Sequence, residues 1–470
     1  MKGNLKISQI IWYGLGGEAY MIVFALTTTW MMYGYCPPAG KGTALVSLAT
    51  FSTVTTLARI LEALLNPVVG ILSDNTRTRW GRRIPYIFVG TVVMAVSTIM
   101  ISRPPVETGM DKLNVIYFSV LYIILTISSL IMFQPILALG PEITVDSNER
   151  VKVTSITLFM GVLTGLVNLT QGPIFQKFGF ADMTLVFGIL AFILGMGPVL
   201  FINEKRDVIK RDNIEINHRK ISFIKGLKGI LGNKIFMLFT LANSIQMLSF
   251  ITLTTMAPYL LTEIAGKRPA DAATLGLFSI IGMFFGIPAA NLITKRMCKK
   301  KVFAWSVLIN SVLFGLMSVL PLMPKPYVFK LILAFAVVFS FFFMFTNTVK
   351  NPMMADIILF DSQFSGERKE ALYIGTHGLI FRMIDSTNIA ITGALFYWFG
   401  YSADKPLGIL LVFPICALLN LLSYLIIQGY PLDDKGGFLE GYKEKFGTLV
   451  ETLKQSKTKS LEQSHITFYK

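Results

Sequence analysis

Charged side chains are scarce in this sequence. Asp, Glu, Lys and Arg make up only 15% of its 470 residues, whereas 53% of the residues are hydrophobic. The mean hydropathy of +0.61 is too high for a soluble globular chain of this length. This composition excludes a soluble protein and indicates an integral membrane protein.

Cysteine is also scarce, with Cys36, Cys298 and Cys416 far apart in the chain. Three separated cysteines offer neither a disulfide framework nor a metal-binding cluster. The sequence also lacks a nucleophile with a nearby base, a phosphate-binding glycine loop and the spacings typical of metal ligands. We therefore expect neither enzymatic activity nor a bound metal or cofactor.

Long apolar runs dominate the rest of the chain. A bilayer core of about 30 Å needs roughly 20 apolar residues for each helical span. The sequence predicts twelve such spans, which lie near 9–34, 44–73, 85–102, 113–140, 153–174, 181–202, 235–262, 270–294, 302–323, 328–349, 371–399 and 406–428.

The net charge of +16 follows the membrane topology. Lys and Arg concentrate in the even-numbered connections, the central linker and the two tails, and they are few in the odd-numbered connections. The positive-inside rule then places both termini in the cytoplasm. We expect the basic residues to face membrane lipids rather than nucleic acid, in a multi-pass protein of the plasma membrane.

The longest hydrophilic interruption divides six spans from six. The sequence therefore predicts an N-terminal bundle over 1–202, a cytoplasmic linker over 203–234, a C-terminal bundle over 235–428 and a cytoplasmic tail over 429–470. The linker contains "ISFIKGLKGIL", whose alternation of apolar and basic residues is typical of a helix on the membrane surface.

Two pairs of segments indicate an internal duplication. The segment "PEITVDSNER" at 141–150 is similar to "ADIILFDSQFSGER" at 355–368, and the basic loop after Asn66 is similar to the one after Ile287. Transporter folds are commonly built from such repeats. The basic loops alone could reflect topology, but the paired acid and Arg clusters can form ion pairs at the cytoplasmic ends of the two bundles.

The segment "GILSDNTRTRWGRR" at 70–83, together with these two acidic segments, resembles the glycoside-pentoside-hexuronide:cation symporters of the major facilitator superfamily, a group that includes melibiose permease. The resemblance implies an all-α membrane protein of twelve helices in two six-helix bundles. It also implies a cytoplasmic gate, for which the sequence offers Asp74, Arg77, Gly81, Arg82, Arg83, Glu142, Asp146, Glu149, Arg150, Asp356, Glu367 and Arg368.

An ionisable side chain inside a span is costly and is therefore a functional candidate. Arg59, Glu62 and Asn66 lie on one helical face of span two. In the resembling family this region carries two acids that bind the coupling cation. Glu62 matches the first acid, and Asn66 occupies the position of the second. Arg382 aligns with a family lysine in span eleven. The family's acid of span four and arginine of span five are replaced by Phe133 and Leu158.

These residues lead us to expect cation or proton coupling through Glu62, Asn66, Arg59 and Arg382. One carboxylate favours a proton over sodium, which prefers several hard oxygen ligands. Uncoupled transport and a purely structural Arg59–Glu62 pair remain alternatives, as does a local pair between Arg382 and Asp385.

Candidates for substrate contact are the polar and aromatic side chains of spans one and eleven. Aromatic rings can stack on sugars and carboxylates can accept hydroxyl hydrogen bonds, although Trp and Tyr near span ends are also interfacial anchors. A lone histidine inside a span can equally be a packing residue. The candidates are Glu18, Tyr20, Trp30, His377 and Asp385.

The sequence therefore predicts a monomeric secondary active transporter that moves a small solute, a sugar or glycoside, by alternating access and proton coupling. The alternatives are a transporter of a non-sugar solute such as a lysolipid or an organic acid, and a membrane receptor that does not transport.

Overall fold

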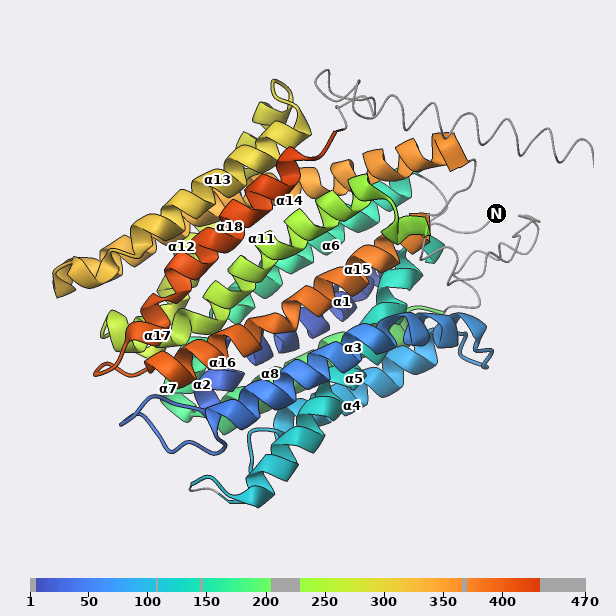
Figure 1. Cartoon of the computed structure of the whole chain (residues 1–470). Helices are drawn as coiled ribbons and strands as arrows, with labels where there is room; N and C mark the ends of the chain where they lie inside the picture. The colour runs from blue at the N-terminus through green and yellow to red at the C-terminus, as the bar shows by residue number, and fades with distance from the viewer. Residues whose placement is uncertain (1–5, 107–108, 144–146, 204–228, 366–369, 432–470) are drawn as a thin grey trace, which may run out of the picture.

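The computed structural model describes residues 6–106, 109–143, 147–203, 229–365 and 370–431. The predicted surface helix of the linker and the cytoplasmic tail lie outside these residues, except for their edges. Two groups of helices pack side by side with nearly common axes, the N-terminal one in blue to green and the C-terminal one in green to red (Figure 1).

In its described residues, the N-terminal half contains eight helical segments. They are α1 (Ile7–Thr29), α2 (Met31–Tyr35), α3 (Leu48–Asn75), α4 (Ile84–Met100), α5 (Lys112–Ile143), α6 (Ser147–Asn168), α7 (Gln171–Phe178) and α8 (Phe180–Phe201).

The C-terminal half begins with α11 (Lys234–Tyr259), which continues as the π-helical turn η1 (Leu260–Ile264). The other segments are η2 (Pro269–Asp271), α12 (Ala272–Thr294), α13 (Lys299–Met317), η3 (Leu320–Leu322), α14 (Lys325–Ser365), α15 (Glu370–Asp385), α16 (Thr387–Phe399), α17 (Leu407–Leu410) and α18 (Val412–Gln428).

Among the described residues, eleven helical stretches are long and apolar enough to cross a membrane, and α4 is a shorter apolar helix. This confirms the predicted all-α architecture of twelve spans. We call the end that carries Lys6, the α3–α4 loop and the α12–α13 turn the basic end. The opposite end, which carries α2, η1 and η2, is the far end (Figure 1).

The predicted end of span ten was wrong. The helix does not stop near residue 349 but runs on to Ser365, so Asp356 lies on a helix instead of in a loop. The reason is that Met353 and Ile357, one turn apart, are fully buried in the core of the C-terminal half. Burial of this apolar stripe favours helix over loop. Spans one, five and eleven are also interrupted, by the breaks between α1 and α2, α6 and α7, and α15 and α16.

Small residues allow the helices to approach closely. A Cβ atom added at Gly282 of α12 would lie 2.2 Å from the carbonyl oxygen of Val337 in α14, and one at Gly90 of α4 would lie 2.6 Å from the backbone nitrogen of Met132 in α5. The obstructing atoms are backbone, so only a movement of the helices could make room. Glycine is therefore required at these crossings.

We predict that Gly282→Ala lowers the midpoint of thermal unfolding of the purified protein, because overpacking costs about 1–3 kcal/mol. Gly315→Ala is the matched control, since a Cβ atom at Gly315 would meet open space. That control should unfold at the same or a higher temperature, because alanine favours a helix over glycine by about 1 kcal/mol. Equal midpoints for the two variants would contradict the close crossing.

Candidate functional site

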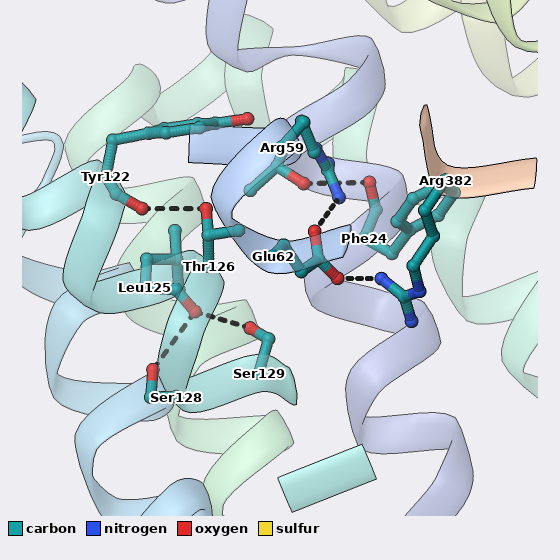
Figure 2. Close-up of polar contacts among 10 residues, drawn as sticks. Phe24, Arg59, Glu62, Tyr122, Leu125, Thr126, Ser128, Ser129 and Arg382 are labelled. Carbon is teal, nitrogen blue, oxygen red and sulfur yellow. Dashed lines mark hydrogen bonds and ion pairs between the residues drawn. The ribbon is translucent and has the colours of Figure 1, made fainter. Parts of the chain in front are cut away.

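A buried carboxylate joins the two halves. Glu62 of α3 is only 2% exposed. Its Oε2 accepts a hydrogen bond from the Arg59 guanidinium at 3.1 Å, and its Oε1 accepts one from the Arg382 guanidinium of α15. Figure 2 shows the carboxylate between the two arginines, which approach it from different sides. Both oxygens of Glu62 are therefore engaged by cations.

Local structure explains how α3 presents this pair. Ser47 caps the helix by accepting a hydrogen bond from the Thr50 backbone N–H, and the helix then runs without a break past the site. Residues three apart lie on the same face, so Arg59 and Glu62 meet within one turn. The second arginine comes from the other half of the chain, and an i, i+3 pattern could not have identified it.

Two further groups surround this pair. Asp385, at the end of α15, interacts electrostatically with both Arg59 and Arg382. The Arg59 guanidinium lies over the Phe24 ring at 5.3 Å from its centroid, a cation–π contact. Two arginines and two acids thus form a balanced set, which we call the charge cluster and define as Arg59, Glu62, Arg382 and Asp385.

A small cavity of about 20 Å³, room for about one water molecule, adjoins the charge cluster. Tyr20, Phe24 and Tyr122 contribute to its wall, and the ring of Tyr122 extends from α5 toward Arg59 (Figure 2). Of the substrate candidates predicted in α1, Tyr20 therefore lies beside the charge cluster. Its ring stacks on Phe133 with the centroids 4.1 Å apart.

The other candidates of the first two spans do not join the charge cluster. Asn66 is half-buried, one turn beyond Glu62, and its side chain makes no hydrogen bond to a described residue. Glu18 faces α6, where it interacts with Thr164. Trp30 is 2% exposed, stacks on Phe175 near the far end, and contributes to the wall of a cavity of about 250 Å³ that side chains of both halves line.

His377 lies in the wall of a separate cavity of about 460 Å³ within the C-terminal half. Its Nδ1 is 3.2 Å from the Thr240 hydroxyl and its Nε2 is 3.4 Å from the Asn243 amide nitrogen, both on α11. Lys350 of α14, which the sequence analysis did not single out, lines the same cavity. It directly follows residue 349, the predicted end of span ten.

Within the described ranges, no group of three or more His, Cys, Asp or Glu side chains is placed to hold a metal ion. A hard cation at Glu62 would also have to displace an arginine from a carboxylate oxygen.

The predicted cytoplasmic gate is only partly visible. Gly81 has a positive φ of 116°, which favours glycine, and it closes a tight turn with Thr78. Arg77 is exposed and Arg82 half-buried, whereas Arg83 is 5% exposed. Asp356 forms an ion pair with Lys299 at 2.6 Å. The side chains of the remaining predicted gate residues lie outside the described part of the structure: Asp74, Glu142, Asp146, Glu149, Arg150, Glu367 and Arg368.

Sequence reasoning missed a set of contacts that closes the far end between the halves. Lys41 Nζ lies 2.7 Å from Oε1 of the buried Glu263 and donates a hydrogen bond to the Thr262 carbonyl at 2.8 Å. The Tyr259 hydroxyl donates to the Cys36 carbonyl at 2.9 Å. We call Cys36, Lys41, Tyr259, Thr262 and Glu263 the far-end closure. More than 200 residues separate its two sides, so no local pattern reveals the pairing.

Solved membrane transporters share this fold. The nucleoside transporter NupG aligns with a TM-score of 0.60 over 90% of this chain and 99% of its own, at 11% identity. A bacterial homologue of the human lysosomal transporter Spinster, in an inward-facing and unoccupied conformation, aligns with a TM-score of 0.64 over 92% and 98%, at 12% identity. These alignments, at 11% and 12% identity, show the fold that this chain shares with them.

The family described as MFS/sugar transport protein matches residues 12–434. The chain is 24% identical to the inner membrane symporter YicJ of Escherichia coli (strain K12) over 85% of each chain. It is 27% identical to the isoprimeverose transporter of Lactiplantibacillus pentosus over 66% of this chain and 63% of that protein. The chain belongs to the MFS/sugar transport protein family, and within it to the glycoside-pentoside-hexuronide:cation symporters. It is a multi-pass protein of the plasma membrane, and not an enzyme.

The far-end closure predicts how Cys36 reacts. Burial raises the pKa of the Cys36 thiol to about 12, so little of the reactive thiolate is present near neutral pH while the far end is closed. Opening would hydrate the thiol and increase the thiolate fraction. The experiment uses a Cys298→Ser, Cys416→Ala background and measures the rate at which a membrane-impermeant maleimide labels Cys36. Lys41→Gln should raise this rate by about threefold to fivefold, because the lost ion pair is worth about 1 kcal/mol.

Lys405→Gln is the control for this measurement, because Lys405 is an exposed lysine at the same end and makes no ion pair with a described residue. The control should label at the parental rate. A Lys41→Gln variant that labels no faster than the control would show that this ion pair does not hold the far end closed.

Proposed function

We propose that this transporter is a proton symporter for a sugar or glycoside and that Glu62 carries the proton. The observation that carries the proposal is the position of Glu62 between an arginine of its own helix and an arginine of the opposite half. The names of the relatives support the solute class, since one is an isoprimeverose transporter and another is the lactose permease of Leuconostoc lactis.

The two arginines make the charge of Glu62 depend on conformation. With both partners in contact, the carboxylate is favoured because two guanidinium groups donate charge-assisted hydrogen bonds to it. When α15 moves away from α3, Arg382 leaves and Glu62 keeps a single cationic partner in a site of low dielectric. Loss of that partner favours uptake of a proton by the carboxylate. Proton binding and rearrangement of the two halves are thereby coupled.

A proton fits this site better than sodium. Sodium needs several hard oxygen ligands, and the second acid of the family pattern is Asn66 here. Phe133 and Leu158 remove two more polar groups of that pattern: Phe133 stacks on Tyr20, and the side chain of Leu158 in α6 is 68% exposed. One carboxylate between cations can exchange a proton without any further ligand.

The proposal includes an orientation and an association state. The basic end faces the cytoplasm, as the positive-inside rule indicates, and the far end faces outward. The far-end closure then belongs to a state in which the outer path is shut. We propose that the protein works as a monomer in contact with membrane lipids. The reason is that both halves of a single chain supply all four residues of the charge cluster.

The experiment is solute accumulation in proteoliposomes that contain the purified protein, screened with a panel of radiolabelled sugars and β-glycosides. A gradient of one pH unit supplies about 1.4 kcal/mol, so one proton for each solute molecule permits at most about tenfold accumulation. We predict that the wild-type protein approaches this limit. Glu62→Gln should retain exchange of labelled for unlabelled solute at equal concentrations but accumulate none against a gradient.

Asp182→Asn is the matched control, since Asp182 is an exposed acid in the first turn of α8. It should accumulate solute as the wild-type protein does. Undiminished proton-driven accumulation by Glu62→Gln would remove Glu62 from the coupling role. Accumulation driven by a sodium gradient and not by a pH gradient would overturn the choice of ion.

A further inference from the structure

A cavity of about 590 Å³ lies at the basic end, between the start of α4 and the end of α8. The α3–α4 loop contributes Arg79 and Trp80 to its wall, α4 contributes Ile84 and Phe88, and the C-terminal end of α8 completes it. Neither the charge cluster nor the predicted gate supplies a residue to this wall. The volume falls within the range of small-molecule sites, so the cavity is a separate candidate site.

The short length of α4 places this cavity at the boundary between membrane and water. At about 1.5 Å per residue, the 17 residues of α4 span about 25 Å, which is less than a hydrocarbon core of about 30 Å. A helix this short has its ends at that boundary, so its first residue, Ile84, lies near the lipid headgroups. Trp80 is exposed beside it, and tryptophan is enriched at the same level of the membrane.

A tight turn presents the cation of the cavity. Thr78 and Gly81 exchange backbone hydrogen bonds of 3.2 and 3.3 Å, so Arg79 and Trp80 form the tip of the turn. The Trp80 ring packs edge-on against Phe88 of α4, with the ring centroids 5.8 Å apart. This contact anchors the tip on the cavity wall and holds the neighbouring Arg79 there.

Arg79 brings a positive charge to a wall that has no acid. It is exposed and makes no ion pair with a described residue. The described residues that line the cavity include no Asp or Glu, and the first turn of α4 contains none either. A guanidinium group can donate two parallel hydrogen bonds to a phosphate. The charge of this site therefore favours an anion, and the planar shape of the guanidinium favours a phosphate.

An apolar surface leads from the cavity toward the middle of the membrane. Val89, Val93 and Val96 of α4 are exposed and recur at intervals of four and three residues, which places them on one helical face. Leu200 at the end of α8 is exposed as well and contributes to the cavity wall. Such a surface suits acyl chains, whereas a free phosphate ion would make no contact with it.

We propose that this cavity binds an anionic phospholipid, with the phosphate against Arg79 and the acyl chains along the apolar surface of α4 and α8. The Trp80 ring then lies beside the glycerol region of the lipid. A zwitterionic lipid such as phosphatidylcholine fits less well, because its own cation would lie close to the guanidinium. The site shares no residue with the charge cluster, so the inference goes beyond the proposed transport function.

The test is photolabelling of the purified full-length protein in micelles of a neutral detergent. The probes are analogues of phosphatidylglycerol and phosphatidylcholine that carry the same diazirine in one acyl chain, and mass spectrometry of peptides locates the adducts. We expect the phosphatidylglycerol probe to label residues 84–89 and 196–203 about fivefold more than the phosphatidylcholine probe. Unlabelled phosphatidylglycerol should compete for this site, and inorganic phosphate at the same concentration should not.

Arg79→Gln should reduce the labelling by the two probes to about equal levels, while Arg79→Lys should keep part of the preference. Arg296→Gln is the matched control, because Arg296 is an exposed arginine at the same end that lies outside the cavity, in the α12–α13 turn. It should be labelled as the wild-type protein is. An unchanged midpoint of thermal unfolding shows that each variant is folded.

Four results would overturn the inference. Equal labelling of the wild-type protein by the two probes would remove the anion requirement. A preference that survives Arg79→Gln would show that another group selects the headgroup. Competition by inorganic phosphate would assign the site to a free phosphate ion. Labelling of other exposed apolar segments, without any adduct at residues 84–89 and 196–203, would show that the lipid does not enter the cavity.

Discussion

The carboxylate of Glu62 is held by two guanidinium groups that belong to different halves of the molecule. In a low-dielectric site a carboxylate and its cations stabilise one another strongly, and each becomes costly when its partner leaves. The contact between α3 and α15 is therefore stable while the Glu62 carboxylate pairs with the Arg382 guanidinium. If Arg382 leaves, a proton bound to Glu62 would neutralise the carboxylate in its place. In the proposed mechanism, this condition links the charge state of Glu62 to the arrangement of the two halves.

Helix α15 connects this charge cluster to the cavity of about 460 Å³ within the C-terminal half. Arg382 faces α3, whereas His377 lines the cavity. Five residues separate them, which places them about 140° apart around the helix. The cavity wall and the carboxylate of Glu62 thus contact different faces of the same helix. A movement of α15 that breaks the Arg382 contact would therefore also change the wall of this cavity.

Much of the fold could be predicted from the sequence, because each span needs about 20 apolar residues and these runs are long. The Arg59–Glu62 pair could also be predicted, since i, i+3 spacing places the two side chains on one face. The sequence could not decide whether Arg382 pairs with Asp385 on its own helix or with Glu62 across the halves, because that depends on how α15 packs. The Lys41–Glu263 contact, the extension of α14 and the position of Lys350 in a cavity depend on tertiary packing in the same way.

The measurement that tests this account most directly is a double-mutant cycle between Glu62→Gln and Arg382→Gln, with the free energy of unfolding of the purified protein as the readout. If the carboxylate joins the halves, the double variant should be destabilised by less than the sum of the single variants, with a coupling energy of at least about 1.5 kcal/mol. Additive effects within about 0.5 kcal/mol would contradict the account, since they would show that Glu62 and Arg382 stabilise the protein independently of each other.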